Sequence, residues 1–298
     1  MPYLALSIDL RAPDAERVEA ACFASGALAV TFSDARDDAI LEPALGTQPL
    51  WPSTRLQALY AADSDAVLLK LVLAARLGIE PAAIQSANVA DRVWEREWLR
   101  DFKAMKFGRR LWVCPHHEQV TDPEALIVAL DPGLAFGTGT HPSTALCLEW
   151  LDGQLPAGAE VLDFGCGSGI LALAAARLGA RHVVAYDIDP QALLATSQNA
   201  AANGLSAQIS VCARAADLPE QTGIILANIL AGTLEDLAWD FAGRLGSGGR
   251  LLLAGILAEQ ADAVTGAYAP WFDIQLAGQR QDWVALEGIR SGDVHGLS

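Results

Sequence analysis

The fold of this chain is decided by the stretch Asp163-Phe164-Gly165-Cys166-Gly167-Ser168-Gly169, which joins an apolar strand to a helix. Val161 and Leu162 precede the stretch, and the apolar run from Ile170 to Leu178 that follows it is typical of a helix. Glycines in such a turn let bare backbone approach a ligand, because they have no Cβ and tolerate unusual dihedrals. The helix start adds free N–H groups and the positive end of the helix dipole. The turn therefore predicts a ligand site.

A second feature lies eighteen residues beyond Gly169, where the apolar run Val183-Val184-Ala185-Tyr186 ends at Asp187. A carboxylate at the end of the second strand of such a unit commonly binds the hydroxyls of a ribose. An ordinary surface carboxylate is the alternative, but the glycine turn upstream favours the ribose role. Asp189 is expected to cap the next helix, because it precedes Pro190 and proline favours the first helical position. The two features predict a nucleoside-cofactor site.

The spacing of the glycines separates one kind of nucleoside cofactor from another. Enzymes that bind dinucleotides use G-x-G-x-x-G, whose third glycine allows close helix–strand packing beside the pyrophosphate. Here the glycines are Gly165, Gly167 and Gly169, and Ile170 takes the place of the third fingerprint glycine. The turn therefore favours a cofactor that has no pyrophosphate.

The stretch 131–144 is rich in glycine and proline, which is typical of a loop that folds over a ligand. Its aromatic residue, Phe136, could lie near a sulfonium or an adenine. Pro142 favours a helix start at that point, which puts Thr144 in the first turn beside free N–H groups. Thr144 could there bind a carboxylate group of a ligand. His141 is either a base or a residue that only orders its turn.

Asn228 follows the apolar run Ile224 to Ala227, at the carboxyl end of a further expected strand. Ligands of open α/β sheets bind at those strand ends. An amide in this place can accept a hydrogen bond from an amine nucleophile. The alternative is a helix N-cap for Leu230 to Leu245, and both roles could hold together.

The first ninety residues predict a small domain of their own. Their order of strand, helix, strand, strand, helix and strand is the split β-α-β, ferredoxin-like plan. The expected elements are Tyr3 to Leu10, Asp14 to Ala24, Ala27 to Ser33, Thr54 to Ala61, Asp65 to Leu77 (capped by Ser64) and Ile84 to Val89.

The segment Arg92 to Lys106 is different, because Trp94, Trp98 and Phe102 recur at a spacing of four among five cations. This pattern predicts a helix with an aromatic stripe. A connecting helix is favoured, since such stripes are usually buried, and a nucleic-acid or ribosome-facing element is the alternative. We expect domains at residues 1–91 and 126–298, joined by a helix and linker at residues 92–125.

From about Leu126 onward, apolar runs typical of strands alternate with helical patterns. This alternation predicts a parallel sheet with helices on both faces. The expected strands are Val161-Leu162, His182 to Tyr186, Gln208 to Cys212, Ile224 to Ala227 and Arg250 to Ala254, followed by a hairpin of Phe272 to Ala277 and Asp282 to Glu287 around Gly278-Gln279-Arg280-Gln281.

Composition narrows the class of protein. The 298 residues are 52% hydrophobic, too apolar for disorder, and no apolar run is long enough to span a membrane. The five cysteines are scattered without a C-x-x-C pair, and the N-terminus lacks the pattern of a secretory signal. We therefore expect reduced thiols, no bound structural metal, no membrane partner and a cytoplasmic location.

The net charge of −16 is unevenly placed, with −2 in residues 1–110 and −14 in residues 111–298. An acidic body repels phosphate backbones and attracts cationic partners. The charge therefore argues against DNA or RNA as the direct substrate, although solubility alone would also account for it.

These motifs resemble those of class I S-adenosylmethionine-dependent methyltransferases. Val161 to Gly169 match the first motif of that class and Tyr186 to Asp189 the second. Asn228-Ile229-Leu230 stands where amino-methyltransferases often carry Asn-Pro-Pro-Tyr. Together with the loop 131–144 and the run Ala227 to Gly232, they make nearly the whole chain resemble the bacterial ribosomal protein L-eleven methyltransferase family. The loop and the Asn-Ile-Leu motif are specific, whereas the glycine motif is shared across class I.

The resemblance implies a Rossmann-like α/β domain, with a mostly parallel seven-stranded sheet and a terminal antiparallel hairpin, plus a small ferredoxin-like domain that holds the substrate. It implies methyl transfer from S-adenosyl-L-methionine to the α-amino and lysine ε-amino groups of ribosomal protein L-eleven, either free or in the large ribosomal subunit. Asn228 is the candidate catalytic residue. The implied cofactor contacts are Thr144, Gly165, Gly167, Asp187, Asn228 and Phe136.

Such a transfer is an in-line displacement at a methyl group that positive sulfur already activates, so alignment is the main requirement. The attacking amine must be neutral, and a free lysine has a pKa near ~10.4. We expect partial desolvation to lower that pKa without a dedicated base, because the Asn228 motif contains no carboxylate or histidine. The acidic catalytic domain would steer a basic substrate.

Other functions remain open at this point. The same fold could methylate another protein, a small-molecule amine or an RNA, although the charge disfavours RNA. A nicotinamide-dependent oxidoreductase is a different class, against which Ile170 counts. A non-catalytic module with a relic pocket is disfavoured by the intact loop, Asp187 and Asn228.

Overall fold

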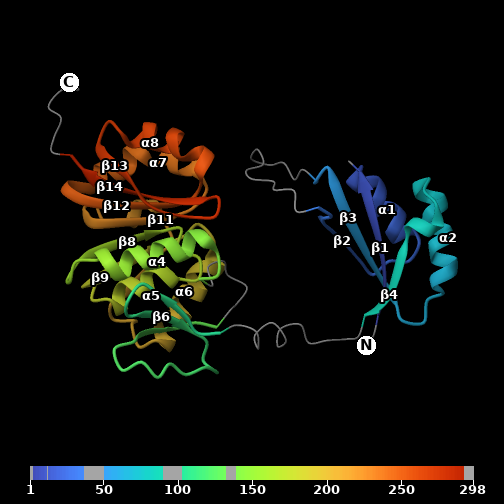
Figure 1. The fold of residues 1–298 in the computed structure, drawn as a ribbon, viewed down its shortest axis with the longest axis horizontal. Coiled ribbons are helices and arrows are strands. Elements are labelled where there is room, and N and C mark those ends of the chain that lie inside the picture. The colour runs from blue at the N-terminus through green and yellow to red at the C-terminus, as the bar shows by residue number, and fades with distance from the viewer. Residues whose placement is uncertain (1–2, 12, 37–49, 90–102, 132–138, 292–298) are drawn as a thin grey trace. The chain divides into compact units, whose positions relative to one another are not determined.

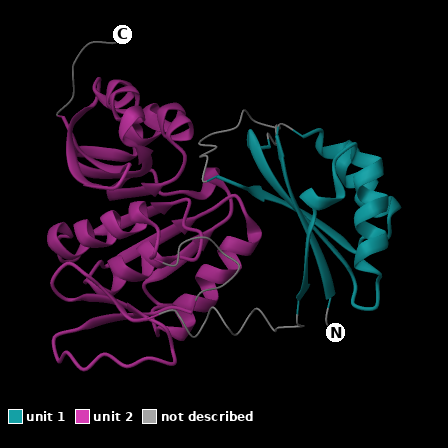
Figure 2. Ribbon diagram, turned by 45° about the vertical axis from the view of Figure 1, so that its right-hand side comes forward, with its two compact units in different colours: residues 1–97 teal, residues 98–298 magenta. Residues whose placement is uncertain are grey.

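The computed structural model describes residues 3–11, 13–36, 50–89, 103–131 and 139–291. The chain divides into two compact units, residues 1–97 and residues 98–298 (Figure 2). Each unit has an apolar core of its own, so each is described separately.

The N-terminal unit is one antiparallel sheet with two helices on one face (Figure 1). Its strands lie in the order β2-β3-β1-β4. Each predicted element is present, with ends that differ by about two residues at most. The elements are β1 (Tyr3–Arg11), α1 (Ala15–Ala24), β2 (Ala29–Asp34), β3 (Ser53–Ala61), α2 (Ala66–Leu77), a 3-10 turn (Pro81–Ala83) and β4 (Gln85–Val89).

Alternation along β3 shows why this sheet covers only one core. Leu56, Ala58 and Tyr60 are buried under the helices, whereas Arg55 and Gln57 are exposed on the other face. Side chains of a strand point to opposite faces in turn, so a period of two gives one apolar face. The pattern that predicted the strand therefore also fixes which face the helices cover.

The cap of α2 corrects the sequence prediction by one residue. Asp65, not Ser64, has the extended N-cap backbone, and its Oδ1 accepts from the N–H groups of Val67 (2.9 Å) and Leu68 (3.1 Å). Both residue types are good caps, and the backbone path into the helix selects between them. Gly78 ends the helix in a left-handed conformation, as predicted.

The second unit is built on a seven-stranded sheet in the order β10-β9-β8-β11-β12-β14-β13. The five strands from β10 to β12 are parallel, and β14 and β13 are antiparallel. The elements are α4 (Pro142–Gln154), β8 (Glu160–Phe164), α5 (Ile170–Arg177), β9 (His182–Tyr186), α6 (Pro190–Ala202), β10 (Ile209–Cys212), β11 (Thr222–Asn228), α7 (Ala231–Arg244), β12 (Leu245–Leu257), α8 (Ala261–Tyr268), β13 (Phe272–Arg280) and β14 (Trp283–Arg290), with 3-10 turns at Ala215–Asp217 and Ala258–Gln260.

Helices cover both faces of this sheet. Leu226 of β11 packs into the core with α4 and α5, whereas its neighbours Ile225 and Ala227 pack into the core with α7 and α8. Both faces being apolar explains why the central strands are continuous apolar runs in the sequence. The predicted alternation of strands and helices after Leu126 is confirmed.

A small second sheet precedes the large one in the chain. It holds β5 (Met105–Phe107), β6 (Leu111–Cys114) and β7 (Leu126–Ala129) in the order β5-β6-β7. The helix predicted for Arg92 to Lys106 lies mostly outside the described residues, and its end is wrong. Met105 and Lys106 instead pair with β6, because a strand partner from later in the chain overrides local helical spacing.

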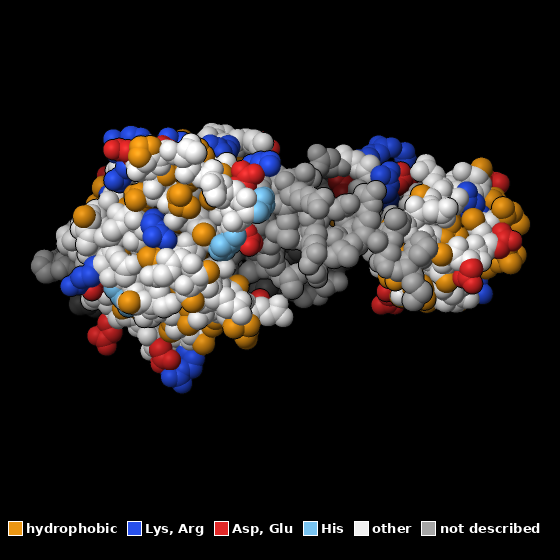
Figure 3. All heavy atoms as spheres, turned by 90° about the horizontal axis from the view of Figure 1, so that it is seen from below, with side chains coloured by type: hydrophobic (Ala, Val, Ile, Leu, Met, Phe, Trp, Pro, Cys, Tyr) orange, Lys and Arg blue, Asp and Glu red, His pale blue; other side chains and the backbone are white. Residues whose placement is uncertain are grey.

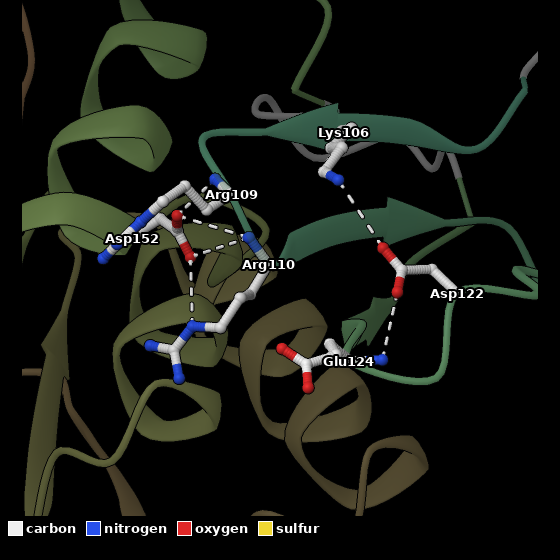
Figure 4. Close-up of polar contacts among 6 residues, drawn as sticks. All are labelled: Lys106, Arg109, Arg110, Asp122, Glu124 and Asp152. Atoms are coloured by element: carbon white, nitrogen blue, oxygen red, sulfur yellow. Dashed lines mark hydrogen bonds and ion pairs between the residues drawn. The ribbon is translucent and has the colours of Figure 1, made fainter.

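The turn between β5 and β6 is attached to α4 by a carboxylate (Figure 4). Asp152, almost fully buried, accepts from the backbone N–H groups of Arg109 and Arg110. Gly108 precedes them with a φ of +68°, and a Cβ there would lie 2.8 Å from the Cβ of Asp152. On the other side of the turn, the Lys106 ammonium lies 3.5 Å from the Asp122 carboxylate.

The terminal hairpin is tighter than predicted. Pairing continues to Arg280↔Trp283, so the turn is Gln281-Asp282 instead of the four residues from Gly278 to Gln281. Gln281 has a φ of +54°, a region that glycine or asparagine would adopt more readily.

Among the described residues, no helix is both long and apolar enough to span a bilayer.

Candidate active site

The glycine turn follows β8, Asp187 follows β9 and Asn228 ends β11. These strands are neighbours in the order β9-β8-β11, so the three features lie at the same carboxyl end of the sheet. Open α/β sheets bind ligands at this edge, because loops leave the strands there in different directions. The structure therefore brings together the three features that the sequence predicted separately.

The glycine turn depends on the absence of side chains. Gly165, Gly167 and Gly169 have φ values of +79°, +54° and +81°. A Cβ on Gly165 would overlap the Ile229 side chain, and one on Gly169 would lie 2.8 Å from Oγ1 of Thr196. The glycines are required both for the backbone conformation and for close packing on two neighbouring segments.

Asp187 braces the turn and keeps capacity for a ligand. Its Oδ2 accepts from the N–H of Gly167 (2.9 Å) and its Oδ1 from the N–H of Asp189 (3.0 Å). Each carboxylate oxygen has two lone pairs, so each can accept one further hydrogen bond. Asp187 is half-buried, and Ile188 beside it is 86% exposed. The carboxylate is thus held in place with acceptor sites left for two hydroxyls.

Asp189 begins α6 as predicted. Its side chain accepts from the N–H of Gln191 (2.8 Å), and Pro190 is the first helical residue. The helix ends at Asn203 and Gly204, also as predicted. The two aspartates therefore have different tasks, which the position of the proline had indicated.

Asp163 lies under the turn and is 1% exposed. Its Oδ2 accepts from the N–H of Ala172 in the first turn of α5 (3.0 Å), and its Oδ1 has no partner among the described residues. Burial, with a smaller contribution from the nearby charge of Asp187, raises the pKa of Asp163 to about 7. The sequence alone indicated no separate role for Asp163 beyond its place in the glycine motif.

Thr144 and Asn228 are in direct contact. Nδ2 of Asn228 donates to Oγ1 of Thr144 over 3.2 Å, which joins the end of β11 to the first turn of α4. Thr144 is buried, and Asn228 is half-buried. The alternative in which Asn228 caps the next helix is wrong, because α7 starts at Ala231 with Leu230 as its N-cap.

His141 orders the start of α4. It is the N-cap residue, and its Nδ1 accepts from the N–H of Ser143 (3.3 Å) and lies 2.7 Å from Oγ of Ser143. Its ring also meets the edge of Trp283, with the ring centroids 4.6 Å apart. Burial lowers the pKa of His141 below its ordinary value. Phe136 lies outside the described residues.

Several supporting residues were not found from the sequence. Gly255 of β12 has a φ of +81°, and a Cβ there would overlap the carbonyl of Ile229. Thr196 and Asn199 of α6 donate hydrogen bonds to carbonyl groups of the glycine turn. Polar residues on an inner helix face were the available signal, but nothing in the sequence shows which carbonyls they meet.

The fold and the residues at the carboxyl end of its sheet define the class of protein, a Rossmann-like enzyme that binds a nucleoside cofactor. Comparison with known proteins identifies the family. The sequence model of the family described as ribosomal protein L11 methyltransferase (PrmA) matches residues 2–291. Relatives with that name from Pseudomonas aeruginosa and Azotobacter vinelandii are each 49% identical, over 294 and 291 residues, covering 98% and 97% of this chain and 100% of the relative. The chain therefore belongs to the ribosomal protein L11 methyltransferase family, and it is an S-adenosylmethionine-dependent methyltransferase.

A solved structure agrees with this assignment. The ribosomal protein L11 methylase of Lactobacillus delbrueckii subsp. bulgaricus is 33% identical, with a TM-score of 0.59. The match covers 64% of this chain and 100% of that one. The expected family resemblance and the α/β fold with mixed sheets are confirmed.

Proposed function

We propose that this enzyme transfers methyl groups from S-adenosyl-L-methionine to the α-amino group and lysine ε-amino groups of ribosomal protein L11. The observation that carries the proposal is the contact between Thr144 and Asn228, beside a glycine turn that Asp187 braces. The Asp187 carboxylate, proposed to bind the ribose, and the Asn228 amide, proposed to bind the amine, thus lie at the same end of the sheet. The printed names of the relatives supply the protein substrate.

The residues at this edge suit the cofactor by their chemistry. Asp187 keeps acceptor sites for the two ribose hydroxyls, and Gly165 and Gly167 have the positive φ values that shape the turn proposed to hold the nucleoside. Thr144 lies in the first turn of α4, where N–H groups favour a carboxylate. We also assign Phe136 to the cofactor from its position in the loop.

Asn228 is proposed to orient the amine. When its Nδ2 donates to Thr144, its Oδ1 is left to accept from the substrate nitrogen. Bound S-adenosylmethionine supplies a methyl group that positive sulfur already activates. Asn228 and the turn then contribute alignment, which is where most of the rate can come from in a displacement of this kind.

No side chain is needed as a dedicated base in this proposal. His141, which begins the helix that carries Thr144, has its Nδ1 engaged in the cap of α4. A neutral amine is required, and removal from water lowers the pKa of a lysine. Exclusion of water by the docked substrate protein would thus supply neutral amine at physiological pH.

We assign the substrate protein to the N-terminal unit. Its four-stranded sheet, in the order β2-β3-β1-β4 with both helices on one face, supports the ferredoxin-like plan. We propose residues 1–91 as the recognition domain, 92–125 as the connector and 126–298 as the catalytic domain. The chain divides after residue 97, so β5 and β6, which lie within the proposed connector, belong to the second compact unit.

Charge supports a basic partner and argues against nucleic acid as the direct substrate, and the scattered cysteines are the basis for proposing a cytoplasmic location. Residues 111–298 carry a net charge of −14. On the face drawn in Figure 3, cationic and anionic side chains are mixed instead of gathered into one patch. We propose that the attraction acts through the net charge of the domain, so it should weaken as salt is added.

The test incubates the enzyme with labelled S-adenosylmethionine and either purified L11, whole large subunits, ribosomal RNA or free lysine. We expect label in L11, in the free protein or in the subunit, and mass spectrometry should place it on amino groups. Asn228→Ala is expected to lower kcat by about 10- to 100-fold while S-adenosylhomocysteine still binds. Label that enters RNA or free lysine but not L11 would overturn the proposal.

A further inference from the structure

Two side chains of α6 donate hydrogen bonds to the backbone of the glycine turn. The hydroxyl of Thr196 donates to the carbonyl oxygen of Gly167 (3.0 Å), and Nδ2 of Asn199 donates to that of Ser168 (2.8 Å). Thr196 is completely buried. Spaced three apart, the two residues lie on one face of the helix. Buried polar side chains are usually hydrogen-bonded, and the partner of Thr196 is the backbone of the glycine turn.

We propose that Thr196 and Asn199 are positioning residues for S-adenosylmethionine, and that they hold the peptide units at Gly167 and Ser168 in the orientation that binds it. The inference rests on the proposed function, because it assigns a role to residues behind the same cofactor turn.

The reason lies in the geometry of the peptide unit. A trans peptide points its carbonyl oxygen and the next N–H in opposite directions. When Thr196 holds the Gly167 carbonyl toward α6, the N–H of Ser168 points away from α6. The helix therefore determines which way that part of the turn presents its backbone.

The rest of the turn shows why these two bonds matter. The N–H groups of Gly165 and Cys166 both donate to the carbonyl of Tyr186, at 2.8 and 2.9 Å. The N–H of Gly167 donates to Asp187, and that of Gly169 to the carbonyl of Cys166 (2.7 Å). These bonds fix the N–H groups, whereas the carbonyls of Gly167 and Ser168 accept from the side chains of α6.

Without those two donors the turn would gain freedom, because glycine has the widest range of backbone dihedrals. A ligand that binds one conformation would then have to select it from several, which weakens its apparent affinity. The expected loss is therefore in cofactor affinity. A purely structural bond would reduce stability alone.

The variants follow from the contacts. Thr196→Val keeps the shape and removes the donor, Thr196→Ser keeps the donor, and Asn199→Ala removes the second donor. Asn203→Ala is the matched control, because Asn203 is the C-cap residue of the same helix. Its side chain bonds the backbone of Ala129 (2.7 and 2.8 Å) and of Asn199 (2.8 Å) instead of the turn. Each variant is assayed for the dissociation constant of S-adenosylhomocysteine by calorimetry, for kcat and KM, and for Tm.

We expect Thr196→Val and Asn199→Ala to raise the dissociation constant about five- to tenfold, the size of one net hydrogen bond. The KM for S-adenosylmethionine should rise in parallel while kcat changes by less than about twofold. Thr196→Ser should bind within about twofold of the unaltered enzyme, and Asn203→Ala should lower Tm without changing the dissociation constant.

Unchanged affinity in both Thr196→Val and Asn199→Ala would overturn the proposal, and so would an equal loss in Asn203→Ala. Should Thr196→Val fail to fold, Asn199→Ala decides the result by the same measure. A failure of the proposed function looks different, since the unaltered enzyme would then bind no S-adenosylhomocysteine or leave L11 unlabelled.

Discussion

Two turns in the catalytic unit are held by aspartates in nearly the same way and have different uses. The turn after β5 has Gly108 at a φ of +68°, and Asp152 accepts from its backbone N–H groups. The turn after β8 has Gly167 at a φ of +54°, and Asp187 accepts from its N–H. Both carboxylates come from another element and fix a glycine turn.

The difference between the two aspartates is exposure. Asp152 is 5% exposed and enclosed by the turn that it holds, so it attaches a small sheet to α4. Asp187 lies half-buried at the open edge of the sheet. The same kind of hydrogen bond serves only the fold where the carboxylate is enclosed, and it is compatible with ligand binding where the carboxylate is half-buried and has unused lone pairs.

The largest effect is expected at a third aspartate, Asp163, which lies beneath the second turn. Its pKa of about 7 in the folded chain exceeds the ordinary 3.8, so the folded state holds a proton that the unfolded state has lost. This contribution to stability is full below pH 3.8 and disappears as the pH rises through 7. A rise from 3.8 to about 7 corresponds to at most about 4 kcal/mol.

Urea titrations between pH 4 and pH 8 measure this effect. The free energy of unfolding should fall across that range in the unaltered enzyme, and fall less in Asp163→Asn, which stays neutral. The same slope in both proteins would show that Asp163 is ionised in the folded state throughout.

The next effect is expected at Asp152. Asp152→Ala leaves the N–H groups of Arg109 and Arg110 without their acceptor and opens a void, so it should destabilise the unit by about 3 kcal/mol. Denaturant unfolding gives this value. Affinity for S-adenosylhomocysteine should stay within about threefold, and a much larger loss would mean that the two turns are coupled.

Asp187→Ala tests the other side of the comparison. The variant loses the acceptor for Gly167 and for the proposed ribose hydroxyls, so affinity for S-adenosylhomocysteine should fall about 100-fold. That loss corresponds to about 2.7 kcal/mol. The free energy of unfolding without ligand should fall by only about 1 kcal/mol. Calorimetry measures the loss of affinity, and urea unfolding measures the loss of stability. A stability loss as large as that of Asp152→Ala would show that Asp187 serves the fold as much as Asp152 does.

The smallest effect is expected at His141. His141→Ala removes the cap of α4 and should lower stability by about 1 kcal/mol. The pH–rate profile should keep its shape, since His141 is not the base in the proposed reaction. A profile that loses its rise with pH only in this variant would assign His141 a role in proton transfer.

Much of the fold was predictable because its signals are local. Continuous apolar strands, alternating helices and the Asp189-Pro190 helix start all depend on neighbours in the sequence. The errors occurred where strand pairing overrides the local pattern. Met105 and Lys106 form a strand because β6 pairs with them, and the last hairpin shortens its turn because pairing continues to Trp283.

The site was predictable to the same extent. Motif spacing was enough to single out Gly165, Gly167, Asp187, Thr144 and Asn228, and their roles toward the cofactor and the amine remain predictions. The direct bond between Thr144 and Asn228 was not visible, since 84 residues separate them in the chain. The sequence also left open whether Asn228 caps the next helix. The structure excludes this, because α7 begins at Ala231 with Leu230 as its N-cap.

The sequence by itself determined the α/β class, the glycine turn and the family, because hydrophobic period and residue spacing are properties of the chain. Only the tertiary structure decided which groups meet at the carboxyl edge and which aspartate is enclosed. Burial and hydrogen bonding join segments that are far apart in sequence, and these contacts set both the pKa of Asp163 and the acceptor sites left on Asp187.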